Sequence, residues 1–222
     1  MIEVVGIIYR SPAFRDFLEG QMYEQGWGIG GVKYRTVAND PVPGLRLTDD
    51  CDIYHDPNPT DHYLARVYRC WNYCVESSTA EYVCLVNSDM AFSPGWLEAL
   101  KRRLDGRTLP CSRLVEPGFI RPGQHALEID IGRDPSTFPF EAWHSMVRDL
   151  TEPRTEAGGL FMPCVLHRET FLRVGGYPHG NVGPVSGDAV LFYAMAEAGF
   201  QHVTCFDSLV YHMQEGEMRH HE

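Results

Sequence analysis

Long hydrophobic segments are missing from this 222-residue sequence, and so is an excess of positive charge. No apolar run approaches the roughly 20 residues that a membrane-crossing helix needs, so we expect no membrane span. The 19 Lys and Arg residues are outnumbered by 30 Asp and Glu, which gives a net charge of −11 at pH 7. Because nonspecific nucleic-acid binding depends on clustered Lys and Arg, a protein that mainly grips a phosphate backbone is disfavoured.

A disulfide framework and a secretion signal are missing too. The seven cysteines are an odd number scattered through apolar segments, which is typical of reduced, buried thiols. Cys70 and Cys74 are four residues apart on an expected helix, but one such pair without a second cluster is a weak indication of zinc. The first ten residues, MIEVVGIIYR, contain neither a basic segment nor a small-residue cleavage site. We therefore expect a cytoplasmic protein.

The sequence does contain an alternation of apolar strands and amphipathic helices. The run EVVGIIYR is typical of a strand covered on both faces. Proline at a first helical turn and apolar residues at helical spacing indicate three helices. We expect the third helix to run from its N-cap Ser93 to Leu104. The expected strands are 3–10, 32–40, 49–56 and 81–89, and the other expected helices are 12–26 and 62–78. This order predicts an α/β fold with an open, mostly parallel, twisted sheet flanked by helices, in a single domain of residues 1–222.

The glycines of GWGIGG, residues 26–31, are the first candidate for a ligand-binding loop. A dinucleotide-binding loop follows the first strand and opens a helix, whereas these glycines close a helix and precede a strand. We interpret them as a helix C-cap and a turn.

Polar residues follow three of the expected strands. In open α/β sheets ligands collect outside the carboxyl ends of the strands, so we expect these side chains to line one cleft. Mg²⁺ or Mn²⁺ can be held there by one or two carboxylates while substrate phosphates supply further ligands, which makes Asp89 a candidate metal ligand. A solvated turn carboxylate or a helix cap is the structural alternative. The residues at the strand ends are Tyr9, Arg10, Ser11, Asn39, Asp40, Asn87, Ser88 and Asp89.

The segment LVNSDMAFSPGWLEAL, residues 85–100, resembles the strand, acidic turn and helix of the GT-A glycosyltransferases, and of family 2 in particular. The DXD motif of that family ends the equivalent strand, and its first acidic position is Asn87 here. The resemblance therefore implies that Asp89 is the carboxylate that meets the metal. Asn72 has the spacing of the Asn in the family's ARNxG helix, although the neighbouring Arg and Gly of that motif are replaced.

The second half of the chain extends the resemblance. Residues 158–178 are similar to a family segment in which a strand, a short helix and a glycine turn follow one another. SGDAVLFYAMAEAGF, residues 186–200, resembles the family's ED motif and its helix, with Gly187 in place of the first acid. Asp188 matches the general base of inverting members, since an acceptor hydroxyl must lose its proton as it attacks. An N-cap of a helix over 189–199 is a compatible structural role for Asp188.

The late segment DSLVYHMQEGE is similar to the family's last strand, and His212 matches its histidine. The resemblance as a whole implies a metal-dependent glycosyltransferase that moves a sugar from a nucleoside-diphosphate donor, such as a UDP-sugar, to a saccharide or another hydroxyl acceptor with inversion. Asp188 would be the base, and Asp89 and His212 would hold Mn²⁺ or Mg²⁺. Residues 1–106 would form the nucleotide-binding half and 107–222 the acceptor and catalytic half. The implied nucleotide contacts are Tyr9, Ser11, Asp40, Asn72 and Asn87.

Other functions stay open on the sequence alone. A catalytically silent sugar-nucleotide-binding protein would use the same fold. A nucleotidyltransferase should have a basic triphosphate loop near the first strand, where only Arg10 and Arg15 are available. A retaining reaction and a nucleic acid as acceptor are also open.

Residues 107–157 are the least regular part of the sequence. A long irregular segment inside a compact domain is often a functional loop, so we expect a mobile cover over the acceptor. Within it, Trp143 either stacks on the acceptor or packs into the core.

Overall fold

The structure, a computed structural model, describes residues 1–24 and 30–214. Its first sheet has the strand order β3-β2-β1-β4-β9. Four of these strands pair in parallel and confirm the predicted parallel α/β sheet, and β9 is antiparallel to β4. The strands are β1 (Ile2–Ile8), β2 (Val32–Asn39), β3 (Asp52–Tyr54), β4 (Tyr82–Asn87) and β9 (Val165–His167).

A second sheet stands beside the first, where the sequence predicted only one. Its order is β5-β10-β6-β7, with β8 also paired to β10. The two sheets meet where Cys111 and Cys164 form a β-bridge and the Ser112 amide donates to the Pro163 carbonyl at 3.0 Å. These strands are β5 (Met90–Phe92), β6 (Thr108–Glu116), β7 (Leu127–Glu128), β8 (Thr155–Ala157) and β10 (Gln201–His212).

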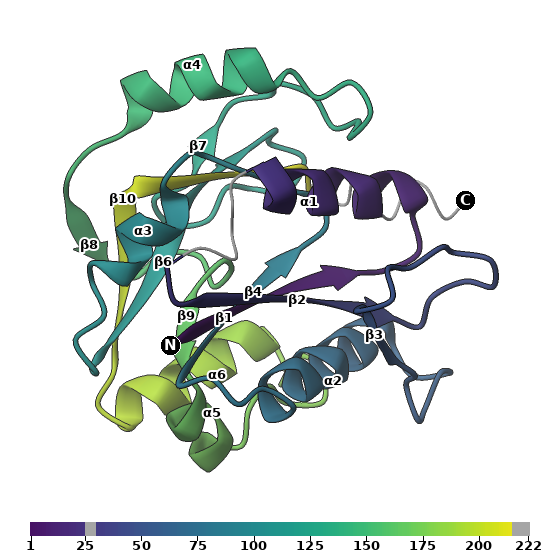
Figure 1. The fold of residues 1–222 in the computed structure, drawn as a ribbon. Coiled ribbons are helices and arrows are strands. Elements are labelled where there is room, and N and C mark those ends of the chain that lie inside the picture. Colours follow the sequence, from purple (N-terminus) through teal and green to yellow (C-terminus); the bar gives the residue numbers. More distant parts are fainter. Residues whose placement is uncertain (25–29, 215–222) are drawn as a thin grey trace.

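Helices cover both faces of the first sheet (Figure 1). The helix α1 (Pro12–Glu24) lies on one face, and α2 (Tyr63–Glu76), α5 (Arg168–Val174) and α6 (Gly187–Glu197) lie on the other. The short α3 (Trp96–Lys101) packs on β10 and β6, and α4 (Phe140–Leu150) covers the outer side of the second sheet. In the described part of the chain, no helix has the length and apolar character to cross a membrane.

The start of α3 differs from the prediction. Gly95, in the left-handed region with φ 77°, is its N-cap, and the helix ends at Lys101 rather than Leu104. Ser93 continues the antiparallel pairing of β5 with β10 instead, because its backbone N–H donates to the Leu209 carbonyl at 3.1 Å. The prediction overlooked β5, a three-residue strand that is specified by its partner rather than by local pattern.

The segment 107–157 is more regular than the sequence indicated. It opens with β6, a nine-residue strand inside the second sheet, and contains α4. Trp143 is fully buried, with its ring centroid 5.9 Å from that of Tyr211, so it packs into the core and does not stack on an acceptor. The expected irregularity is therefore wrong for β6 and α4, and the mobile cover over the acceptor stays a prediction.

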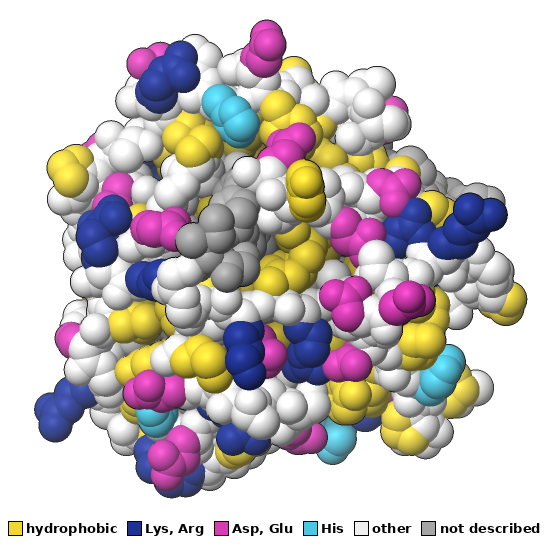
Figure 2. All heavy atoms as spheres, viewed as in Figure 1, with side chains coloured by type: hydrophobic (Ala, Val, Ile, Leu, Met, Phe, Trp, Pro, Cys, Tyr) yellow, Lys and Arg dark blue, Asp and Glu magenta, His cyan; other side chains and the backbone are white. Residues whose placement is uncertain are grey.

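The glycine turn and the thiols agree with the sequence. Gly30 and Gly31 have positive φ angles directly before β2, as a turn requires, whereas Gly26 and Gly28 lie outside the described residues. All seven cysteines are free, and six of them are buried. On the face seen in Figure 2, acidic and basic side chains are interspersed, and no broad patch of either sign stands out.

Candidate active site

The predicted acidic turn joins β4 to β5 at the carboxyl end of the first sheet. Asn87 ends β4, Ser88 and Asp89 form the turn, and Met90 begins β5. Antiparallel pairing places His212, the last residue of β10, opposite Met90. The Met213 amide donates to the Asp89 carbonyl at 3.0 Å, so the end of β10 is fixed beside the turn. The structure thus brings together two predicted metal ligands that are far apart in the sequence.

His212 lies between two buried carboxylates. Its Nε2 is 3.4 Å from Oδ2 of Asp89, and its Nδ1 is 3.0 Å from Oε1 of Glu116, at the end of β6. Burial disfavours the charged imidazolium, but the Asp89 and Glu116 carboxylates outweigh burial and raise the pKa of His212 to about 10. In the absence of a metal, His212 is therefore a cation that pairs with both acids.

The chemistry of this cluster fits a divalent metal. A carboxylate and an imidazole are both ligands for Mn²⁺, and a carboxylate on the second ring nitrogen is the usual way to orient a metal-binding histidine. Glu116 is positioned for that second contact with His212. Over residues 1–24 and 30–214, no group of three or more His, Cys, Asp and Glu side chains has metal-holding geometry. Phosphate oxygens of a substrate would have to complete the coordination.

Asp188 lies in the first turn of α6 and is half-buried. It is not the N-cap that the sequence suggested, because the Ser186 hydroxyl takes that place and accepts from the Ala189 amide at 3.2 Å. The Tyr68 hydroxyl donates to Oδ2 of Asp188 at 2.8 Å. Burial raises the pKa of Asp188, and the bond from Tyr68 offsets part of that rise. A carboxylate in this state can act as a general base.

Aromatic side chains connect Asp188 to the acidic turn. The ring of Tyr68 stacks on Tyr177 with centroids 5.1 Å apart and an interplanar angle of 7°. The edge of Trp71 meets both rings, and its Nε1 donates to the Tyr9 hydroxyl at 3.3 Å. The Tyr9 hydroxyl in turn donates to Oδ1 of Asn87 at 3.2 Å. Two of the predicted nucleotide contacts, Tyr9 and Asn87, therefore meet at the turn.

The other three predicted nucleotide contacts, Ser11, Asn72 and Asp40, also have protein partners. The Ser11 side chain is buried and accepts from the Phe14 amide at 3.4 Å, at the start of α1. Asn72 binds the backbone of Tyr177 twice, accepting its N–H at 2.8 Å and donating to its carbonyl at 2.9 Å. Asn72 thereby holds the glycine turn after α5 against α2.

Asp40 also has partners at the end of β2. It accepts from Arg66 at 2.5 Å and from the Asp56 amide at 2.9 Å. Burial works to raise its pKa, but these hydrogen bonds outweigh burial and lower it. Asp40 is therefore an ionised group that is already paired.

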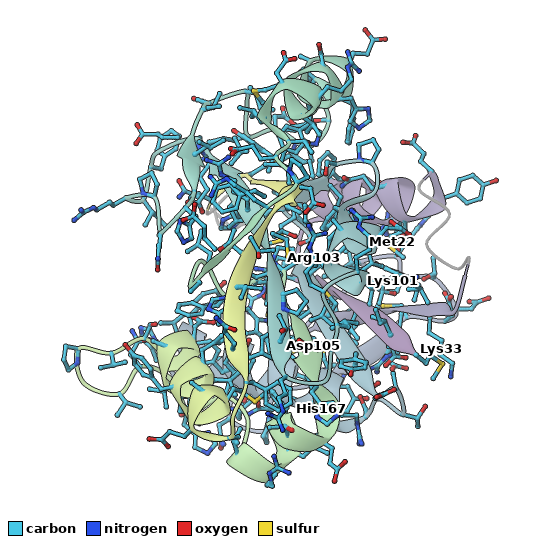
Figure 3. The ribbon with its side chains drawn as sticks, turned by 90° about the vertical axis from the view of Figure 1, so that its left-hand side faces the viewer. Met22, Lys33, Lys101, Arg103, Asp105 and His167 are labelled. Carbon is cyan, nitrogen blue, oxygen red and sulfur yellow. The ribbon has the colours of Figure 1, made fainter. Side chains whose placement is uncertain are left out.

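The basic segment 101–107 is remote from this site. It connects the end of α3 to the start of β6, and Figure 3 labels Lys101, Arg103 and Asp105 in this segment. Arg102 and Arg103 both pair with Asp207, at 2.9 and 2.8 Å. Asp207 stands five residues before His212 in β10, so the basic segment lies beside the first part of this strand and not at its His212 end.

Sequence reasoning missed two residues of the site, Glu116 and Tyr68. Glu116 closes the mostly apolar strand TLPCSRLVE with a carboxylate, the same signal that drew attention to Asp89. Tyr68 has no comparable signal, because a buried tyrosine on an amphipathic helix is ordinary core and its partner Asp188 is remote in sequence.

Comparisons with known proteins place this arrangement on a known fold. Neither a family model nor a curated protein sequence matches the chain. Among solved structures, mannosyltransferase PcManGT from Pyrobaculum calidifontis, in complex with GDP-Man and Mn²⁺, matches with a TM-score of 0.60 and 14% identity over 95% of this chain and 56% of that one. The chain has the GT-A fold.

Two further structures agree with that fold. GalNAc-T7 with UDP, GalNAc and Mn²⁺ matches with a TM-score of 0.59 and 10% identity over 96% of this chain and 43% of that one. Residues 1–349 of S. aureus TarS match with a TM-score of 0.60 and 9% identity, over 96% and 60%. This GT-A chain thus spans about half the length of the structures it matches.

Proposed function

We propose that this protein is a metal-dependent glycosyltransferase that moves a sugar from a nucleoside-diphosphate donor, with UDP as the expected nucleotide, to an acceptor hydroxyl with inversion. The observation that carries the proposal is the pairing of Asp89 with His212 on a GT-A fold, with Asp188 joined to the same turn through aromatic residues. Residues 1–106 would supply most of the nucleotide side, and 107–222 would supply His212, Glu116 and the base.

Asp89 and His212 are the residues that would hold Mn²⁺ or Mg²⁺. The Mn²⁺ in the structures of PcManGT and GalNAc-T7 supports this choice of cofactor. When bound, the metal would neutralise negative charge that grows on the departing diphosphate. Glu116 would keep the imidazole of His212 oriented by accepting from Nδ1, and His212 would have to be neutral at Nε2.

The remaining residues would bind the donor and move one proton. We propose that Tyr9 and Asn87 contact the nucleotide at the turn, whereas Ser11, Asp40 and Asn72 shape its site through the backbone groups that they hold. Asp188 would accept the proton of the acceptor hydroxyl as that oxygen attacks the anomeric carbon. Attack on the face opposite the leaving diphosphate would invert the anomeric configuration. The seven free cysteines support a cytoplasmic location.

Measuring release of nucleoside diphosphate from a panel of sugar nucleotides tests this function. Each donor would be incubated with simple glycoside acceptors in Mn²⁺ and, separately, in EDTA, and the product would be examined by ¹H NMR. We expect turnover that requires the metal and a product with the opposite anomeric configuration. Tight donor binding without turnover across the panel would indicate the silent binding protein instead, and a retained configuration would refute the proposed role of Asp188.

A further inference from the structure

Gly187 occupies the position where the GT-A resemblance places an acidic residue, and the structure explains why a side chain is absent there. A Cβ atom at Gly187 would lie 2.3 Å from Cε2 of Tyr68 and 2.8 Å from the Gly180 carbonyl oxygen. Such distances are far inside van der Waals contact. The ring of Tyr68 therefore fills the space that any larger residue at position 187 would need.

Tyr68 is held firmly in that place. Its side chain is buried in the middle of α2, stacked on Tyr177 and packed against the edge of Trp71. Its hydroxyl points to Oδ2 of Asp188 at 2.8 Å. Within the described ranges, this hydroxyl is the side-chain group that hydrogen-bonds the Asp188 carboxylate.

We propose that Tyr68 is the positioning residue for Asp188, and that Gly187 is required because it admits the tyrosine ring. The inference rests on the proposed function, in which Asp188 is the base. A donor fixed to one carboxylate oxygen restricts the rotation of the side chain and leaves the second oxygen to receive a proton. Tyr68 thus occupies the space next to Gly187 and orients the base.

The same contact also affects the pKa of Asp188. Burial raises the pKa of the carboxyl, and the Tyr68 hydrogen bond works in the opposite direction by stabilising the ionised form. The side chain of Tyr177 also interacts electrostatically with Asp188, and burial raises the pKa of Tyr177 well above its usual range, so it remains neutral. Removing the Tyr68 hydroxyl should therefore raise the pKa of Asp188 further.

The decisive experiment is a ¹³C NMR titration of the Asp188 carboxyl in the wild-type protein, in Tyr68→Phe and in a control variant, Tyr73→Phe. Tyr73 lies on the same helix, but its ring packs against Tyr54 with centroids 5.2 Å apart. We expect the Asp188 titration to move up by about one pH unit in Tyr68→Phe, the size of effect that one hydrogen bond to a carboxylate produces, and not to move in Tyr73→Phe. An unmoved titration in Tyr68→Phe would overturn the proposal.

Kinetics supply a second readout. In Tyr68→Phe the acid limb of kcat/KM should move up with the titration, and kcat should fall by roughly tenfold while donor KM stays constant, because only the base is displaced. A shifted titration with unchanged kcat would refute the positioning role. The titration needs no substrate. A wild-type protein that transfers no sugar would therefore count against the proposed function, while the titration would still test the contact between Tyr68 and Asp188.

Gly187→Ala tests the steric half of the proposal. The added methyl group should displace the ring and reproduce the upward shift of Asp188, and it should add little to the shift when combined with Tyr68→Phe. If Gly187→Ala folds and its Asp188 carboxyl titrates as in the wild type, position 187 does not control the contact between Tyr68 and Asp188. If this variant fails to fold, Tyr68→Phe still decides the role of Tyr68.

Discussion

The Nε2 atom of His212 lies 3.4 Å from Oδ2 of Asp89, although the two residues come from opposite halves of the chain. The contact depends on the antiparallel pairing of β5 with β10, which sets His212 opposite Met90, the residue that follows Asp89. The acidic turn is therefore completed only when the second sheet has formed. This geometry leads to predictions about metal binding, proton transfer and stability.

Asp89→Ala should weaken the binding of nucleoside diphosphate in the presence of Mn²⁺ by roughly tenfold or more, because the metal loses its carboxylate ligand. Binding measured in EDTA should not change. Isothermal titration calorimetry with and without Mn²⁺ measures both effects, and Asp149→Asn, an exposed acid on α4, is the matched control. Equal calorimetric profiles for Asp89→Ala and the wild type would show that Asp89 does not bind the metal.

Glu116→Gln should lower the apparent affinity for Mn²⁺ by roughly 10- to 100-fold, the usual effect of removing a carboxylate that orients a metal-binding histidine. The side chain stays nearly the same size, so the fold should be retained, and circular dichroism checks this. Titrating Mn²⁺ into protein with a fixed concentration of nucleotide gives the affinity. Unaltered metal dependence would mean that Glu116 only balances the charge of His212.

The pH dependence of kcat/KM should report the raised pKa of Asp188. A general base works in its ionised form, so activity should rise as the pH rises through that pKa. Since burial raises the pKa, the acid limb should lie above the ordinary range of an Asp side chain. Rate profiles between about pH 4 and 9 measure the limb, and a limb that persists unchanged in Asp188→Asn would assign it to another group.

Asn72→Ala should lower the free energy of unfolding by roughly 2 to 3 kcal/mol, because it removes two hydrogen bonds and leaves backbone groups of the buried Tyr177 unpaired. Urea denaturation followed by tryptophan fluorescence measures the change. A loss below about 0.5 kcal/mol, the scale of an ordinary surface substitution, would contradict this structural role for Asn72.

The features that the sequence predicted carry local signals. Asp89 lies in the turn that follows an apolar strand, and a helix with a left-handed glycine cap, Gly175, follows β9 as the similarity of residues 158–178 implied. Each of these features is specified by the sequence of a short segment and does not depend on contacts with distant residues. The parallel sheet and its polar strand ends follow from the same kind of information.

The features that the sequence did not reveal depend on remote partners. The strand β5 pairs with β10 along its whole length, and it is also held by Gln21, whose side chain donates to the Met90 carbonyl at 3.0 Å and accepts the Phe92 amide at 2.8 Å. Nothing in the segment MAF itself requires a strand. Tyr68 likewise acquires its place in the site only when α6 brings Asp188 to α2.

The most direct test of the account is the turnover of Asp188→Asn beside its donor affinity. Asparagine keeps the shape of the side chain but cannot accept the proton, so kcat should fall by roughly a hundredfold or more while the dissociation constant of the metal-bound donor stays close to the wild-type value. Asp149→Asn should retain full turnover. Wild-type turnover in Asp188→Asn would contradict the central claim that this carboxylate activates the acceptor.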